Sequence, residues 1–187
     1  STFTENMARD MKEGGCIQVE FGVESGSNRV LKEMKKGTTV ERIREVFEIC
    51  RKYGLRSLAN FMINTPTETE EDLRLTFSLA DEIKATKYVF AVTVPLLGTE
   101  LYHRYVKPKL EPQEYAISGE RRTYQQIVDA RFHMAEHKRN IGLLYIWARI
   151  RYMIFSEYAD SFFWFIKNFR FYKQSIWRKM YYKTLYH

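Results

Sequence analysis

The sequence predicts an α/β fold in which parallel strands alternate with helices, and three observations support this. Strand-like patterns occur at residues 17–23, 58–64 and 88–95, spaced roughly 30 to 40 residues apart. Each of the two gaps between them carries an amphipathic helical pattern. Such an alternation is typical of parallel β/α units.

The first strand is expected to have two unlike faces. Its apolar residues are Ile17, Val19, Phe21 and Val23, and they alternate with Gln18, Glu20, Gly22 and Glu24. In a barrel strand whose outer face is covered by helices, the polar face points into the lumen. A lumen lined in this way suits a polar ligand.

A polar turn, Glu24-Ser25-Gly26-Ser27, follows this strand directly. β/α barrels place their chemistry at the C-terminal ends of strands, so these side chains are candidates for a binding site. The alternative is an ordinary turn with Ser27 as the cap of the next helix.

The helices are located by their caps and apolar stripes. Thr4 is expected to cap a first helix that stops near residues 14–15. Capping boxes are predicted at Thr38 with Glu41 and at Thr67 with Glu70. The expected apolar stripes are Val40, Ile43, Phe47 and Cys50 in one helix and Leu73, Phe77, Ala80 and Ile83 in the next.

The second and third strands are expected to repeat the two-faced pattern. In the second, Ala59, Phe61 and Ile63 share one face, and Asn60 and Asn64 lie on the other. The third is predicted over Tyr88–Pro95, and the residues sharing one of its faces are Val89, Ala91, Thr93 and Pro95.

Three ordered motifs resemble one known family, the radical S-adenosylmethionine (SAM) superfamily. They are FGVESGSNRVLKEMKKG at residues 21–37, FMINTPTETEED at residues 61–72 and VPLLGTELY at residues 94–102. They resemble the fourth-, fifth- and sixth-strand signatures, especially of the branch that often carries an upstream cobalamin-binding domain. The resemblance implies that residues 1–112 are the C-terminal half of the core domain, with strands four to six of a partial (β/α)6 barrel.

The resemblance also implies which residues bind the cofactor SAM. Glu24, with Ser25, and Asn60 match positions that hydrogen-bond the ribose hydroxyls, and Lys36 matches a basic residue that pairs with the SAM carboxylate. Pro95 of the sixth-strand motif joins them as a candidate. Lys36 can also be interpreted simply as a solvated helix end.

Two departures from the family pattern bear on activity. Asn64 and Thr67 stand where the fifth-strand motif usually has glycines, which let the backbone turn tightly beside the adenine. The motif CxxxCxxC, which holds the family's 4Fe-4S cluster, does not occur in these 187 residues. The chain alone is therefore expected to be inactive, as a fragment of an enzyme whose missing half supplies the cluster.

The two cysteines are not candidate ligands. Cys16 precedes the first strand and Cys50 lies on an apolar helix face, and no pair has metal-ligand spacing. Both are interpreted as small hydrophobic residues in a reducing, cytoplasmic setting. No secretion leader is evident at the start of the sequence.

Residues 113–187 are predicted to form an amphipathic helical tail. Residues 1–112 hold 17 basic and 17 acidic residues, so the net charge of +7 lies entirely beyond them. Residues 145–187 combine 16 aromatic residues with 8 Lys and Arg. Peripheral contact with the inner membrane face is one interpretation, and packing on the barrel is the other. Stacking on single-stranded nucleic acid is less well supported, because the pattern is helical.

Two functions therefore stay open from the sequence. In the first, the chain is part of a radical SAM enzyme that performs radical chemistry or methyl transfer with SAM. Its 4Fe-4S cluster would be held outside this sequence, and an upstream domain could add cobalamin as a further cofactor. In the second, it is a non-catalytic remnant or interaction module. The family's substrates are too diverse for the fold to select one.

Overall fold

A computed structural model describes residues 2–108 and 133–154. Its elements, in order, are α1 Glu5–Glu13, β1 Gln18–Glu24, α2 Asn28–Glu33, α3 Val40–Lys52, β2 Arg56–Ile63, α4 Glu70–Ile83, β3 Lys87–Val92, the π-helical turn η1 Tyr102–Val106, α7 Ile141–Ala148 and the π-helical turn η3 Arg149–Ile154. The predicted alternation of strands and helices is confirmed.

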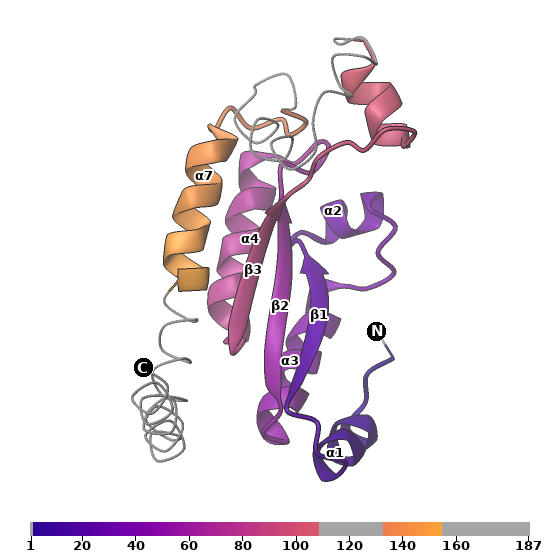
Figure 1. The fold of residues 1–187 in the computed structure, drawn as a ribbon, viewed down its shortest axis with the longest axis vertical. Helices are drawn as coiled ribbons and strands as arrows, with labels where there is room; N and C mark the ends of the chain where they lie inside the picture. Colours follow the sequence, from indigo (N-terminus) through magenta and orange to yellow (C-terminus); the bar gives the residue numbers. More distant parts are fainter. Residues whose placement is uncertain (1, 109–132, 155–187) are drawn as a thin grey trace, which may run out of the picture.

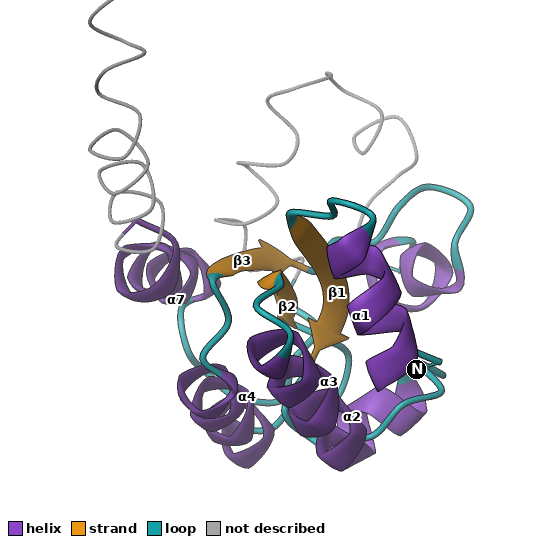
Figure 2. Cartoon of the chain, turned by 90° about the horizontal axis from the view of Figure 1, so that it is seen from below, coloured by secondary structure: helices purple, strands orange, loops and turns teal. Residues whose placement is uncertain are grey.

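The three strands form one parallel sheet in the order β1-β2-β3. Figures 1 and 2 show α3 and α4 side by side along one face of this sheet. Gly22 pairs with Asn60 across β1 and β2, and Asn60 pairs in turn with Val89 of β3. All three strands run in the same direction, so their C-terminal ends meet at one edge of the sheet.

The main core lies between the sheet and these helices. Ala59, Phe61 and Ile63 of β2 are fully buried, as their alternation predicts. Phe61 stacks on Phe90 of β3 with ring centroids 5.0 Å apart. The predicted stripe of α3 is buried from Val40 to Cys50. On the opposite face lie Glu20 and Asn60, next to the apolar residues Leu58 and Val89.

Two of the predicted helix starts are wrong by one or two residues. The N-cap of α3 is Thr39, whose hydroxyl accepts from the Arg42 amide, and not Thr38. The N-cap of α4 is Thr69, which forms a capping box with Asp72. Thr67 cannot fill this role because its backbone is left-handed, with φ 60°, whereas an N-cap residue is extended. The caps at Thr4 and Ser27 are confirmed.

The third strand is shorter than predicted, and the tail is only partly described. β3 ends at Val92, so Pro95 belongs to the loop after it.

The predicted boundary after residue 112 and the stretch from residue 155 onward lie outside the described residues. Among the described residues of the tail, Leu144, Ala148 and Tyr152 are buried in the core cluster formed by residues 1–112. Figure 1 shows α7 beside β3 and α4.

Candidate functional site

The candidate site is built on the open face of β1 and β2, around Gly22. Glu20 and Gly22 are exposed on this face, whereas Val23 points to the core and is 1% exposed. A β-bulge between Gly22 and Glu24, with Glu24 at φ 64°, ends the strand. A left-handed glutamate is uncommon, and at this position it directs the carboxylate back over the open face.

Glu24 and Lys36 pair with each other directly over Gly22. The Lys36 Nζ donates to Glu24 Oε1 at 2.6 Å. A methyl group placed on Gly22 would lie 2.5 Å from Glu24 Oε1 and 2.7 Å from Lys36 Nζ. The absence of a side chain at Gly22 therefore makes room for this pair. Both residues were predicted for one site, but the ion pair between them was not predicted.

Asn60 completes the group from the neighbouring strand. Its Nδ2 donates to Glu20 Oε1 at 2.6 Å, and its backbone lies opposite Gly22. A cavity of about 240 Å³ adjoins this group, between β1 and the start of α3, and Glu20, Gly22, Lys36 and Thr38 are among its lining residues. The Thr38 hydroxyl is buried and has no hydrogen-bond partner within residues 2–108 and 133–154.

We call Glu20, Glu24, Lys36 and Asn60, together with Gly22, the polar cluster. It presents two carboxylates, an ammonium and an amide on the open face of the sheet, around Gly22, which has no side chain. Carboxylates accept hydrogen bonds from hydroxyl groups, and an ammonium pairs with a carboxylate. The cluster can therefore bind a small ligand that carries both a diol and an anionic group.

Two of the candidate residues do not join the polar cluster. Ser25 is fully buried, and its hydroxyl lies 3.1 Å from the Thr76 hydroxyl and accepts from the Ser27 amide. It therefore helps to attach the turn after β1 to α4. Pro95 is buried in the loop after β3. Of the five candidates, the structure brings together Glu24, Lys36 and Asn60.

Asp72 is a further buried anchor of the same turn, which the sequence did not indicate. It accepts from the Ser27 hydroxyl at 2.5 Å, from the Thr69 amide at 2.9 Å and from Arg29. Burial alone would raise the pKa of Asp72, but the hydrogen bonds from Arg29, Ser27 and Thr69 outweigh it and hold this pKa well below its usual value. The turn after β1 is thereby attached to the start of α4.

The loop after β2, residues 64–69, lies against this turn. Arg29 Nη2 donates to the Thr67 carbonyl oxygen at 2.7 Å. Asn64 and Thr67 have φ of 63° and 60°, which is the left-handed region that favours glycine. Both residues stand at glycine positions of the family motif that the sequence resembles, and their backbone has the conformation that such positions need.

Among the described residues, no group of three or more His, Cys, Asp or Glu side chains is arranged to hold a metal ion. Cys50 is buried, and burial raises the pKa of its thiol to about 11. Cys16 is partly buried, and both thiols are free. The described part of the chain also contains no helix long and apolar enough to cross a membrane.

Comparison with known families confirms the predicted relationship. The family model described as the Radical SAM superfamily matches residues 1–80, which include β1, the turn after it and the loop after β2. The segment of residues 1–80 is therefore similar to the radical SAM superfamily. The family is defined by its use of SAM and a 4Fe-4S cluster.

The curated relatives are named as group-transfer enzymes. An uncharacterised methyltransferase of Pyrococcus horikoshii is 37% identical over 119 residues, covering 64% of this chain and 24% of the relative. A cytidylyl-2-hydroxyethylphosphonate methyltransferase of Streptomyces wedmorensis is 32% identical, covering 62% and 23%. The chain thus spans less than a quarter of either relative.

A solved structure is similar over half of the chain. It is a radical SAM methyltransferase from Kitasatospora setae, with cobalamin and a 4Fe-4S cluster bound. Its TM-score is 0.48 at 25% sequence identity, over 51% of this chain and 19% of that protein.

Proposed function

We propose that this chain forms the SAM-binding side of a radical SAM enzyme that transfers a methyl group. The observation that carries the proposal is the polar cluster, in which Glu24 and Lys36 pair over Gly22 while Asn60 lies opposite Gly22 on β2 and donates to Glu20. Methyl transfer, rather than hydrogen abstraction alone, is favoured by the names of the relatives. We place β1, β2 and β3 as strands four to six of a partial (β/α)6 barrel.

The residues present fit SAM. Glu24 and Asn60 offer acceptors and a donor for the two ribose hydroxyls, and Lys36 offers a cation for the carboxylate. Lys36 is 34% exposed and Glu24 15% exposed, so the ammonium can reach a ligand while Glu24 keeps its place. When bound, SAM and the cluster supply the methyl group or the radical, and this chain's residues orient the nucleoside.

The cluster ligands have to come from sequence outside these residues. CxxxCxxC is absent from the 187 residues, which span less than a quarter of the curated relatives. SAM is anchored largely through the cluster iron, so the cluster's absence removes most of the binding energy. The ribose contacts of Asn60, worth about 0.5–1.5 kcal/mol, and of the Glu24 carboxylate, worth about 1.5–3 kcal/mol, do not offset the roughly 4–15 kcal/mol lost on immobilising a ligand.

The first test is genetic and biochemical. The DNA upstream of Ser1 is expected to encode CxxxCxxC about 80 to 120 residues earlier, the spacing that three β/α units require. The complete protein, reconstituted with iron and sulfide without oxygen, should then cleave or demethylate SAM. An open upstream frame without the motif would overturn the enzyme proposal and favour the non-catalytic interaction module.

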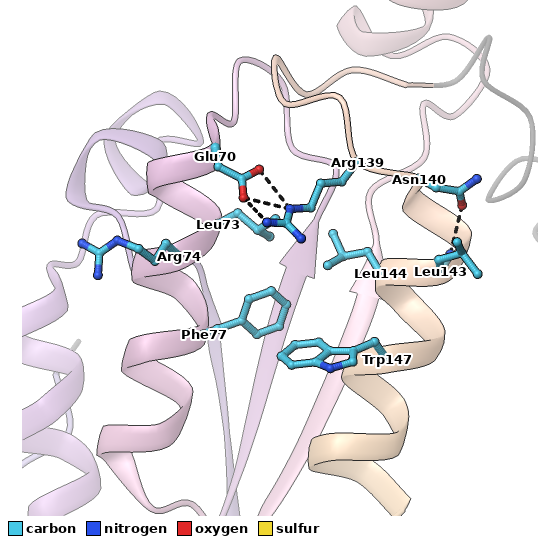
Figure 3. Close-up of a pocket in the computed structure, with 9 residues that line it drawn as sticks. All are labelled: Glu70, Leu73, Arg74, Phe77, Arg139, Asn140, Leu143, Leu144 and Trp147. Atoms are coloured by element: carbon cyan, nitrogen blue, oxygen red, sulfur yellow. Dashed lines mark hydrogen bonds and ion pairs between the residues drawn. The ribbon is translucent and has the colours of Figure 1, made fainter.

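A second candidate function, contact with an anionic lipid surface, is favoured by one observation on α7. This helix is apolar all round: its inner side packs on β3, and its outer side leaves Leu143, Ile146 and Trp147 between 46% and 67% exposed, followed by Ile150 of η3 at 49%. A groove of about 520 Å³ adjoins this stripe between α4 and α7. Figure 3 shows its lining, with the Glu70–Arg139 pair near Leu73 and with Phe77 facing Trp147.

This candidate combines the exposed stripe with the positive charge of residues 113–187. The 187-residue chain should sediment with vesicles containing phosphatidylserine at low salt and dissociate as salt rises. Trp147→Ser with Ile150→Ser should abolish the binding, and Trp147→Phe should keep it. Failure to sediment with anionic vesicles at low salt would exclude this function.

A further inference from the structure

Residues 133–139, which we call the strap, cross back over the loop that follows β2. The Met134 amide donates to Asn64 Oδ1 at 2.9 Å, and the Glu136 amide donates to the Glu68 carbonyl oxygen at 2.8 Å. The Thr67 amide donates to the Met134 carbonyl oxygen at 3.4 Å. Loop and strap are thus joined through main-chain groups on both sides, although about 70 residues separate them in sequence.

Asn64 connects the strap to the sheet. Its backbone is left-handed, a conformation that asparagine tolerates better than most residues. The side chain accepts from the strap through Oδ1, and its Nδ2 donates to the Thr93 carbonyl oxygen at 3.2 Å. Glycine would suit the same backbone but would supply neither bond. Asparagine at this glycine position therefore has a use: it attaches the strap to the ends of β2 and β3.

Glu68 and His137 form the buried centre of the contact. Both side chains are fully buried, and His137 Nε2 lies 3.3 Å from Glu68 Oε2. His137 Nδ1 accepts from the Arg139 amide, so we assign the ring proton to Nε2, which donates to the carboxylate. The backbone amide of Asn64 donates to the same Glu68 Oε2 at 2.9 Å. A buried carboxylate needs such donors, so loss of His137 should release the loop.

The loop held by the strap is also held against the turn that carries Glu24. Arg29, five residues after Glu24, donates to the Thr67 carbonyl oxygen and to Asp72. The loop and the turn both lie at the C-terminal ends of their strands, where β/α folds assemble sites. The loop therefore lies beside the turn that follows Glu24, at the edge of the sheet where the polar cluster is, although none of its residues is among those that line the cavity next to the cluster.

We propose that the strap positions the loop of residues 64–69 for cofactor binding, with Asn64, Glu68 and His137 as positioning residues. The proposal rests on the proposed function for the identity of the ligand, SAM. It adds that residues beyond the matched family segment of residues 1–80 shape the cofactor site through hydrogen bonds to the loop, without contacting the ligand themselves.

The first measurement needs no cofactor: amide hydrogen exchange of the 187-residue chain. In His137→Ala, exchange at the amides of Asn64, Met134 and Glu136 should accelerate at least tenfold, whereas the amides of β1 and β2 should be unchanged. His137→Gln, which can donate to Glu68 from a similar reach, should restore most of the protection. Lys138→Ala is the matched control, because Lys138 is an exposed strap residue.

The second measurement is SAM affinity in the complete, cluster-loaded protein. His137→Ala should weaken binding at least fivefold with the cluster absorbance unchanged, and His137→Gln should recover to within twofold of the wild type. Asn64→Gly removes the strap's acceptor while suiting the left-handed backbone, so it should weaken binding even if His137→Ala fails to fold.

Two results would overturn the proposal. One is unchanged loop protection in both His137→Ala and Asn64→Gly. The other is a loosened loop with unchanged SAM affinity, which would make the strap a structural support only. If the wild-type protein binds no SAM, the proposed function fails, and the exchange measurement still decides whether the strap fixes the loop.

Discussion

The carboxylate of Glu24 and the ammonium of Lys36 lie 2.6 Å apart, directly over the Cα of Gly22. The pair joins the end of β1 to Lys36, 12 positions later, in the loop between α2 and α3. Because Gly22 carries no side chain, two charged groups can approach the strand backbone at the point where Asn60 lies opposite. This relationship defines the polar cluster and provides the first prediction.

Gly22→Ala should displace the Glu24–Lys36 pair and weaken SAM binding in the complete protein without unfolding it. The new methyl group would meet only the ends of flexible side chains, so the free energy of unfolding should stay within about 1 kcal/mol of the wild type. Calorimetric titration with SAM measures the effect. In a Lys36→Met background the same substitution should cost less affinity, and equal losses in both backgrounds would show that Gly22 acts by another route.

Gly26→Ala should destabilise the fold severely for a different reason. A methyl group there would lie 2.6 Å from the Leu75 carbonyl carbon and 2.7 Å from the Thr76 Cα, which are backbone atoms of α4 that cannot move aside cheaply. We expect a loss of about 3 kcal/mol or more in urea unfolding. Gly98→Ala is the control: it has open space, and its φ of 82° limits the cost to about 1 kcal/mol. Equal losses in the two variants would contradict the close packing of the turn on α4.

Stability should fall in acid through Asp72. The folded-state pKa of Asp72 is lowered, so its contribution is present above its unfolded pKa, about 4, and is lost as the pH falls below that value. Asp72→Asn should therefore lose about 1–3 kcal/mol at pH 7 and show a smaller further loss between pH 5 and pH 3 than the wild type. Urea unfolding across this range measures it. Parallel pH profiles for the two proteins would show that Asp72 is not the group responsible.

Thr67→Gly should stabilise the chain. A β-branched residue at φ 60° carries a left-handed penalty of roughly 1–2 kcal/mol, and the contacts of its hydroxyl with Arg29 and Glu33 are exposed. We expect a gain of about 0.5–1 kcal/mol in thermal or urea unfolding. Thr67→Ala loses the same hydroxyl but keeps the left-handed penalty, so it should gain little or nothing. A loss of stability in Thr67→Gly would show that its side-chain contacts outweigh the strain.

The sequence predicted the elements best where hydrophobic periodicity was strong. Ala59, Phe61 and Ile63 of β2 are buried as predicted, because these apolar residues recur at every second position without interruption. The helix starts were less well predicted, since neighbouring threonines compete for the N-cap position. At α4 the left-handed backbone of Thr67 excludes this residue as the N-cap and leaves Thr69. A positive φ at a non-glycine residue leaves little trace in the sequence.

The candidate site was predicted in part. Glu24, Lys36 and Asn60 followed from the family resemblance, but Ser25 lies in the packing against α4 because the bulge at Glu24 shifts the alternation of the strand. Gly22 could have been noticed, because a glycine inside a strand often marks a close approach. The contact of His137 with Glu68 joins residues 69 positions apart, and no local pattern predicts such a pair.

The central claim is that the polar cluster binds SAM. The most direct measurement is the SAM dissociation constant of the complete, cluster-loaded protein with Glu24→Ala and Asn60→Ala combined, beside Gln18→Ala as a control at the far end of the same strand face. The double variant should bind SAM at least tenfold more weakly, since each lost hydrogen bond is worth about 1 kcal/mol, while the cluster absorbance and the control stay unchanged. Wild-type affinity in the double variant would show that SAM does not bind at Glu24 and Asn60.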